Sequence, residues 1–318
     1  MGCRPVGDDN PLNGWAWKCS VPGAEEGPLA GRTVALKDNI ALAGIPMMNG
    51  SPIMEGYVPR EDATVVTRLL DAGAHIIGKT AVPALCFDGG GCTGYPEPQP
   101  VNPHDRERLA GASSNGSAVV VTNGEVDMAL GGDQGGSIRL PASWSGCYGI
   151  KGTHGLVPYT GIFPIELTLD HVGPMARTAE DCARMLEVLA GSDGLDPRQY
   201  DVRTAKYTEA LSEDLTGIHI GILREGFGIA GVSEPDVDAA VKEAISVLEK
   251  WALVRRRYRY PCITTGLRCG VRSPLREPLN SWSEAMVTAQ TGEGITAHSL
   301  WTFTAGLAEL AVMTLATQ

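Results

Sequence analysis

Residues 131–142 read Gly-Gly-Asp-Gln-Gly-Gly-Ser-Ile-Arg-Leu-Pro-Ala, a glycine-rich turn around one serine, Ser137. The apolar stretch 126–130 before the turn is typical of a buried strand. Consecutive backbone N–H groups in such a turn can converge on one oxygen and form an oxyanion hole. Glycine-rich turns before helices also bind phosphates. The turn matches neither G-x-x-x-x-G-K-[ST] nor G-x-G-x-x-G, so nucleotide binding has little support.

A lysine ends the first strong strand signal of the chain. The stretch Thr33–Leu36 predicts a buried strand, and Lys37 follows it directly. Burial disfavours the charged amine and lowers its pKa from about 10.4 towards neutrality, where a neutral lysine acts as a base. The alternative is a lysine that only forms a salt bridge at a strand end.

A run of small residues, Gly111–Ser117, stands at the end of a long loop predicted over Phe87–Gly116. Small side chains let the backbone and hydroxyl groups approach another group closely. Read alone, the same run is a helix N-terminus with serine capping.

The order of elements predicts a parallel crossover unit. After Thr33–Leu36 comes a helix with Asp62 as its N-cap and an apolar stripe up to Gly73, and then a short strand at His75–Ile77. This strand–helix–strand spacing favours a mostly parallel sheet. Later segments predict helices at 117–122, 178–189 and 236–250 and a strand at 218–222, with Thr178 and Asp181 as a capping arrangement.

Composition narrows the function classes. The chain has 318 residues and a net charge of -11, which argues against a nucleic-acid partner. It has no run of about 18 apolar residues and no signal-peptide core at its start, so we expect a cytoplasmic protein with no membrane partner. Eight cysteines without a C-x-x-C pair predict reduced thiols, and six histidines lack zinc-site spacing.

Taken together, four segments resemble the amidase-signature hydrolases, over roughly Gly31–Gly191. The matching segments are Ala35–Asn39, Gly111–Ser117, Gly131–Ala142 and Leu169–Arg177. Their joint occurrence in this order and spacing is very specific. The resemblance implies an α/β fold, a large twisted mixed β-sheet flanked by helices. It also implies catalysis without a metal or organic cofactor.

The resemblance assigns roles residue by residue. Ser137 is similar to the family's nucleophile, and Ser113 to the bridging serine, which follows a cis peptide bond after Ala112. Lys37 is similar to the base that completes this Ser-Ser-Lys triad. The backbone N–H groups of Gln134, Gly135, Gly136 and Ser137 resemble the oxyanion hole. Three residues are expected to support the site: Ser114 by hydrogen bonding, and Asp133 with Arg139 as a buried pair.

The form of the turn with Gln134, together with residues 9–15, resembles bacterial amidases that often occur beside nitrile hydratase. Members of this branch are near 500 residues long, so the chain is expected to be truncated at both ends. We expect an N-terminal extension at 1–30 and a catalytic domain at 31–250. A divergent, lysine-free tail is expected at 251–318, with seven Arg against four Glu.

Three functions remain open at this stage. The first is an amidase that hydrolyses a small aliphatic or aromatic carboxamide at its C–N bond, with a pathway link to nitrile hydratase. The second is an amidotransferase subunit that passes ammonia to a partner on a tRNA. Gln134 and the lack of a basic face weigh against this second function. The third is an inactive truncated remnant. The sequence leaves the acyl group and a homodimer undecided.

Overall fold

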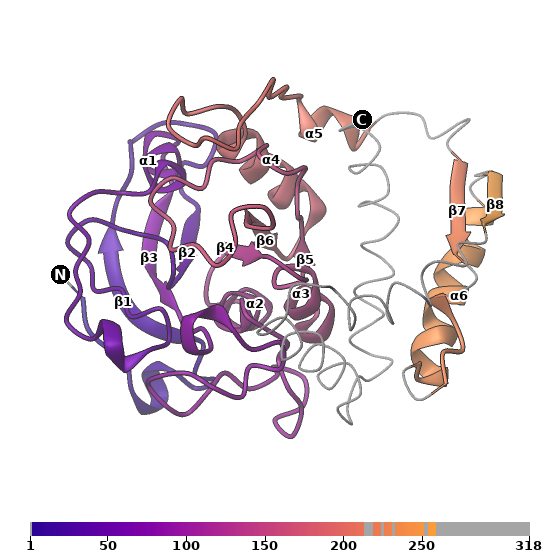
Figure 1. Ribbon diagram of the computed structural model, residues 1–318, viewed down its shortest axis with the longest axis horizontal. Coiled ribbons are helices and arrows are strands. Elements are labelled where there is room, and N and C mark those ends of the chain that lie inside the picture. The colour runs from indigo at the N-terminus through magenta and orange to yellow at the C-terminus, as the bar shows by residue number, and fades with distance from the viewer. Residues whose placement is uncertain (1, 213–218, 224–225, 231–232, 251–253, 259–318) are drawn as a thin grey trace, which may run out of the picture. The chain divides into compact units, whose positions relative to one another are not determined.

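The computed structural model of the chain describes residues 2–212, 219–223, 226–230, 233–250 and 254–258. The chain divides into two compact units (Figure 1). The described part of the first unit is 2–212, and it carries every residue predicted for catalysis. The second unit contains the other described segments.

The first unit contains a six-stranded sheet. Its strands are β1 (Trp15–Val21), β2 (Thr33–Lys37), β3 (His75–Thr80), β4 (Met128–Asp133), β5 (Tyr148–Gly149) and β6 (His171–Ala176). Their order is β1-β3-β2-β4-β6-β5, in which β2 is parallel to both β3 and β4 and the other neighbours are antiparallel. The predicted mixed sheet flanked by helices is confirmed, and the carboxyl ends of β2 and β4 lie side by side. The expectation of a mostly parallel sheet is wrong, because three of its five neighbouring strand pairs are antiparallel.

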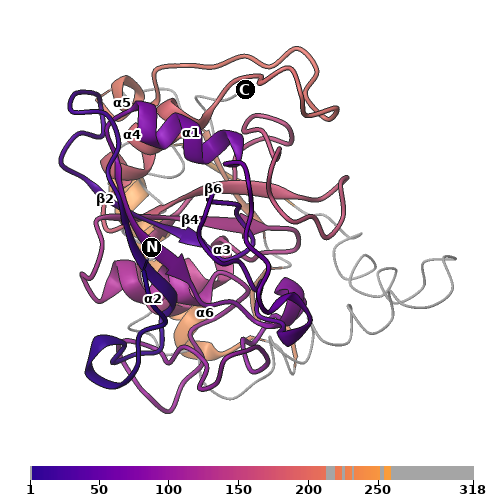
Figure 2. The ribbon, with the colours of Figure 1, turned by 90° about the vertical axis from the view of Figure 1, so that its left-hand side faces the viewer.

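Helices cover both faces of this sheet. They are α1 (Thr64–Asp71), α2 (Asn115–Thr122), α3 (Arg139–Ser145), α4 (Ala179–Leu189) and α5 (Tyr207–Ala210), with short 3₁₀ turns η1 (Gly7–Asp9), η2 (Pro52–Met54) and η3 (Ala84–Cys86). Figure 2 shows α1 and α4 on one side of the sheet and α2 on the other.

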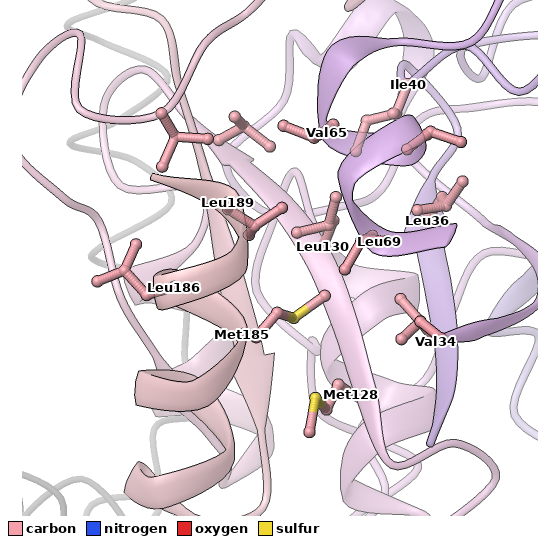
Figure 3. Packing of buried hydrophobic residues seen from close by; sticks show 14 of the residues in the cluster. Val34, Leu36, Ile40, Val65, Leu69, Met128, Leu130, Met185, Leu186 and Leu189 are labelled. Atoms are coloured by element: carbon pink, nitrogen blue, oxygen red, sulfur yellow. The ribbon is translucent and has the colours of Figure 1, made fainter. Parts of the chain in front are cut away.

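The alternation of residues along β2 decides which side chains meet which helices. Val34 and Leu36 pack in the large apolar cluster with residues of α1 and α4 (Figure 3), whereas Ala35 packs in a second cluster with residues of α2 and α3. Side chains two apart on a strand share a face. Lys37 therefore projects from the same face as Ala35, towards the layer that contains α2.

Most predicted elements are present with shifted ends. The helix predicted from residue 117 begins at Asn115, and the strand predicted at 126–130 is Met128–Asp133. The N-cap predicted for α1 is wrong. Its N-cap is Ala63, without a side-chain hydrogen bond, because the Asp62 carboxylate accepts the Ala43 N–H at 2.7 Å.

Capping of α4 agrees with the sequence pattern. The Thr178 side chain accepts the N–H of Asp181 at 3.1 Å, as predicted, and α4 ends at Leu189. The cap satisfies one of the backbone N–H groups that a helix leaves without an internal partner.

The second unit contains a parallel pair of strands, β7 (His219–Leu223) and β8 (Val254–Tyr258), with helix α6 (Pro235–Lys250) between them in the chain. The basic run Arg255–Arg257 of the predicted tail lies in β8. The rest of that tail, residues 251–253 and 259–318, lies outside the described residues, and the predicted boundary at residue 250 stays a prediction.

Candidate active site

Lys37 ends β2 as a fully buried side chain. Its Nζ donates a hydrogen bond of 2.7 Å to Ser113 Oγ, and Ser113 is also fully buried. Burial lowers the pKa of Lys37 from its ordinary value of 10.5, because an amine without water loses the solvation of its charged form. A neutral amine beside a serine hydroxyl is the arrangement that a base requires.

A second buried lysine, Lys79, lies on the neighbouring strand β3. It forms the kind of strand-end salt bridge that the sequence left open as the alternative role of Lys37. Lys79 Nζ lies 3.1 Å from Asp38 Oδ1, and the two side chains are 0% and 2% exposed. Within the described part of the chain, Lys37 forms no such ion pair. The salt bridge at the strand end therefore belongs to Lys79. Burial of Lys37 outweighs its attraction to Asp133 and Asp170, which form no salt bridge with it among the described residues.

Ser113 and Ser114 connect the lysine to the glycine-rich turn. The peptide bond between Ala112 and Ser113 is cis, as predicted. The Ser114 N–H donates to the Ser137 carbonyl at 3.2 Å, and Ser114 Oγ contacts both the N and the O of Gly132 at 3.1 Å. Ser114 is the N-cap of α2 but makes no side-chain cap bond, so the capping interpretation of this run is wrong.

Asp133 organises the turn that carries Ser137. Its carboxylate accepts two hydrogen bonds of 2.9 Å from the Arg139 guanidinium and further ones from the N–H groups of Gly136 and Ile138. Burial raises the pKa of Asp133, but these hydrogen bonds outweigh burial and hold the pKa below its ordinary 3.8. The predicted buried pair needs one correction, because the Arg139 side chain is 52% exposed while that of Asp133 is 1% exposed.

The predicted oxyanion hole also needs a correction. The Gly136 N–H donates to Asp133 Oδ1 at 2.8 Å and is therefore engaged. No acceptor among the described residues takes the N–H groups of Gln134, Gly135 or Ser137, so these three remain available to a substrate oxygen. Gly136 has a φ of +137°, and a Cβ there would meet Leu140 Cδ1 at 2.9 Å. A glycine is required at this point of the turn.

Three residues that sequence reasoning missed also belong to the site. The Tyr159 hydroxyl accepts an N–H from the side chains of Gln134, at 3.0 Å, and Asn39, at 3.4 Å. The Cys86 thiol, also buried, donates to Asn49 Oδ1 at 3.1 Å. Burial raises the pKa of Cys86, opposed by its attraction to Lys37 and hydrogen bonding with Ser113. Asn39 stands inside a matched segment, but Tyr159 lies in a loop and Cys86 in the short 3₁₀ turn η3, neither with any periodic signal.

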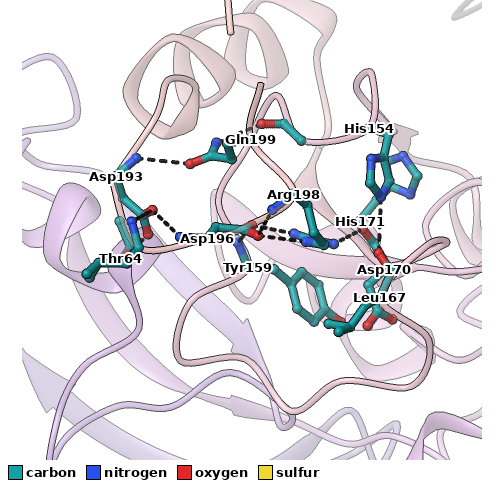
Figure 4. Close-up of polar contacts among 12 residues, drawn as sticks. Thr64, His154, Tyr159, Leu167, Asp170, His171, Asp193, Asp196, Arg198 and Gln199 are labelled. Carbon is teal, nitrogen blue, oxygen red and sulfur yellow. Dashed lines mark hydrogen bonds and ion pairs between the residues drawn. The ribbon is translucent and has the colours of Figure 1, made fainter. Parts of the chain in front are cut away.

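A buried ion pair contacts both the backbone and the ring of Tyr159 (Figure 4). Arg198 Nη2 lies 2.6 Å from Asp196 Oδ2, with the side chains 7% and 3% exposed. The same Asp196 carboxylate accepts the Tyr159 N–H at 2.8 Å, and the guanidinium lies 5.0 Å from the centre of the Tyr159 ring. Arg198 also donates to the carbonyl of Asp170 at 2.7 Å. This network fixes both the backbone and the ring of Tyr159.

Other features of the described residues contribute nothing to this site. No group of three His, Cys, Asp or Glu side chains among them is arranged to hold a metal ion. None of their helices is long and apolar enough to cross a membrane. A hollow of about 350 Å³ is lined by residues between Thr153 and Tyr207, including His154 and Arg203 but none of the triad.

Comparison with known proteins decides the family. The Amidase family model matches residues 16–263. The chain belongs to this family of amidase-signature enzymes. It is 51% identical over 253 residues to an enantioselective amidase of Rhodococcus rhodochrous, a match that covers 78% of this chain and 48% of that protein. It is 43% identical over 252 residues to a glutamyl-tRNA(Gln) amidotransferase subunit of Methanosarcina acetivorans, a match that covers 79% and 52%.

Solved structures of the family agree with the fold. A glutamyl-tRNA(Gln) amidotransferase subunit from Thermotoga maritima matches with a TM-score of 0.74 at 28% identity, covering 92% of this chain and 62% of that one. Native peptide amidase from Stenotrophomonas maltophilia matches with a TM-score of 0.68 at 30% identity and the same coverage. The chain spans about half the length of these two curated relatives, the Rhodococcus amidase and the Methanosarcina amidotransferase subunit.

Proposed function

We propose that the protein is an amidase that hydrolyses a small aliphatic or aromatic carboxamide to a carboxylic acid and ammonia through an acyl-enzyme on Ser137. The observation that carries this proposal is the buried 2.7 Å hydrogen bond between Lys37 and Ser113. The adjoining Ser114 N–H is bonded to the backbone of Ser137. A base, a bridging hydroxyl and a nucleophile-bearing turn thus adjoin one another.

In the proposed reaction, Ser137 Oγ attacks the amide carbonyl carbon while its proton passes to Ser113, whose own proton passes to Lys37. The N–H groups of Gln134, Gly135 and Ser137 stabilise the negative oxygen that forms. The C–N bond then breaks, and the relay returns the proton to the leaving nitrogen, which departs as ammonia. Water, activated by the same relay, hydrolyses the ester on Ser137 and releases the acid.

The proposed substrate class rests on sequence similarity to a curated relative. The Rhodococcus relative is an enantioselective amidase, and 51% identity over 253 residues supports an amide as the substrate of this chain. The pathway link to nitrile hydratase, the cytoplasmic location and a homodimer stay predictions. We propose a pocket for a small amide without assigning its acyl group.

The experiment is ammonia release from propionamide and benzamide by the purified chain. Ser137→Ala is the test variant, and Ser192→Ala, an exposed serine outside the site, is the matched control. Release that vanishes in Ser137→Ala and persists in Ser192→Ala supports the proposal. No release from either amide by a cooperatively folded chain would refute it.

A second candidate function is supported by the 43% identity to a glutamyl-tRNA(Gln) amidotransferase subunit. Such a protein would deliver ammonia to a partner enzyme instead of releasing it. Stable co-purification with a second protein, together with ammonia transfer that exceeds free release, would favour this role.

The third candidate, an inactive remnant, predicts that the isolated chain fails to unfold cooperatively in urea.

A further inference from the structure

Two carboxamide side chains converge on one tyrosine hydroxyl beside the relay. Gln134 Nε2 donates to Tyr159 Oη at 3.0 Å, and Asn39 Nδ2 lies 3.4 Å from the same atom. Asn39 is 1% exposed and Tyr159 is 5% exposed. Because both amide nitrogens point at the hydroxyl, both amide oxygens point away from it.

Neither of these oxygens has a partner. Asn39 Oδ1 and Gln134 Oε1 are buried and accept no hydrogen bond from any described residue. The orientation of Asn39 is fixed a second time, because Nδ2 also donates to the Phe163 carbonyl at 3.4 Å. Buried acceptors are nearly always satisfied, so two unpartnered ones together indicate a ligand that brings N–H donors.

The pair lies near the relay. A Cβ added at Gly132 would lie 3.5 Å from Lys37 Nζ and 3.8 Å from Asn39 Nδ2, so the Lys37 amine and the Asn39 amide both approach the same point of β4. Gln134 stands three residues before the nucleophile on the same turn. The buried Asp196–Arg198 ion pair, drawn beside Tyr159 in Figure 4, keeps Tyr159 in place.

We propose that the carboxamide oxygens of Asn39 and Gln134 form an acceptor pair that recognises the N–H groups of a primary carboxamide, and that Tyr159 is the positioning residue that turns both oxygens away from its own hydroxyl. This inference rests on the proposed function and deepens it by naming the chemical group that the site recognises. An ester of the same acyl group offers no N–H and leaves both oxygens unpaired. A site built to bind N–H groups discriminates against such an analogue.

The test measures binding, so that it does not depend on turnover. Benzamide and methyl benzoate are titrated calorimetrically into the full chain with Ser137→Ala, alone and combined with Tyr159→Phe. Loss of the hydroxyl frees both amides to rotate, and the Kd of benzamide is expected to rise about tenfold, or about 1.4 kcal/mol. The Kd of methyl benzoate is expected to change less than twofold. Tyr207→Phe, which removes the hydroxyl of a buried tyrosine on α5, is the matched control and is expected to alter neither.

Gln134→Met in the same background is the second variant. It keeps the backbone N–H of the turn and removes one acceptor from a partly exposed side chain, so it tests the pair even if Tyr159→Phe fails to fold. Equal weakening of both ligands, no weakening of either, or no benzamide binding to the Ser137→Ala chain overturns the acceptor pair. Failure of the proposed function is seen separately, as the absence of Ser137-dependent ammonia release.

Discussion

Lys37 and Lys79 are both fully buried at the ends of neighbouring parallel strands, and only Lys79 has a carboxylate partner within the described part of the chain. The two lysines differ in their partners for this reason. Lys79 is paired with the Asp38 carboxylate at 3.1 Å, whereas burial lowers the pKa of Lys37 and favours its neutral amine. The hydrogen bond to Ser113 then makes Lys37 the base of the proposed relay.

Replacing this base is expected to remove most of the activity. Lys37→Met keeps the length of the side chain but has no proton acceptor, so kcat for ammonia release should fall about 10²–10⁴-fold. Lys206→Met, on an exposed lysine, should leave kcat unchanged. The comparison is made from initial rates of ammonia release with benzamide. A Lys37→Met protein that keeps more than a third of the activity would contradict the assignment.

The rate should depend on pH through Lys37. Protonated Lys37 accepts no proton, so activity falls as pH falls through its folded pKa and is full above it. Because burial lowers that pKa from 10.5, the rising limb should have its midpoint below 10.5. The measurement is kcat against pH for wild type and for the small activity left in Lys37→Met, which should lack this limb. A midpoint at or above 10.5 would show that Lys37 is an ordinary charged lysine.

Lys79 should matter for stability. Lys79→Met leaves the 2%-exposed Asp38 carboxylate without its counter-ion and should lower the free energy of unfolding by about 3–5 kcal/mol. Lys37→Met removes a poorly solvated amine and should cost less than about 1 kcal/mol. Urea unfolding of both variants measures the difference. The double variant Lys79→Met with Asp38→Asn should recover part of the loss, because it removes the unpaired charge. Equal losses for Lys37→Met and Lys79→Met would mean that the lysines are not distinguished as proposed.

Local patterns predicted three of the six strands of the sheet, β2, β3 and β4, and marked the segments that carry the proposed catalytic residues. Lys37 follows an apolar strand, and Ser113 and Ser137 stand in short runs of small residues. In each case the signal lies within about ten residues, so the sequence displays it directly. The fold class followed from the resemblance of these segments to the amidase-signature hydrolases. The strand–helix–strand spacing by itself indicated only one parallel crossover, β2–α1–β3.

Contacts between distant segments were not predictable in this way. Asp62 looked like an N-cap until the fold placed the Ala43 N–H beside it, 19 residues away. The Asn39–Tyr159 contact joins positions 120 residues apart, and its geometry depends on the loop that the Asp196–Arg198 pair fixes. The engagement of the Gly136 N–H by Asp133 depends on the exact path of the turn, which glycine-rich sequences leave open.

Asp133 should make stability sensitive to acid in a defined direction. Its folded pKa lies below 3.8, so its contribution is fully present above pH 3.8 and is lost as pH falls through the folded value. Asp133→Asn replaces an ionised acceptor of four or more N–H groups and should lower the free energy of unfolding at pH 7 by about 1.5–3 kcal/mol. The half-exposed Arg139 keeps the loss from being larger. The gap to wild type should narrow below pH 3.8. Asp105→Asn, which removes the exposed Arg108 ion pair, is the matched control and should cost less than about 1 kcal/mol. If the Asp133→Asn gap is the same at pH 3 and pH 7, the carboxylate charge does not hold the turn.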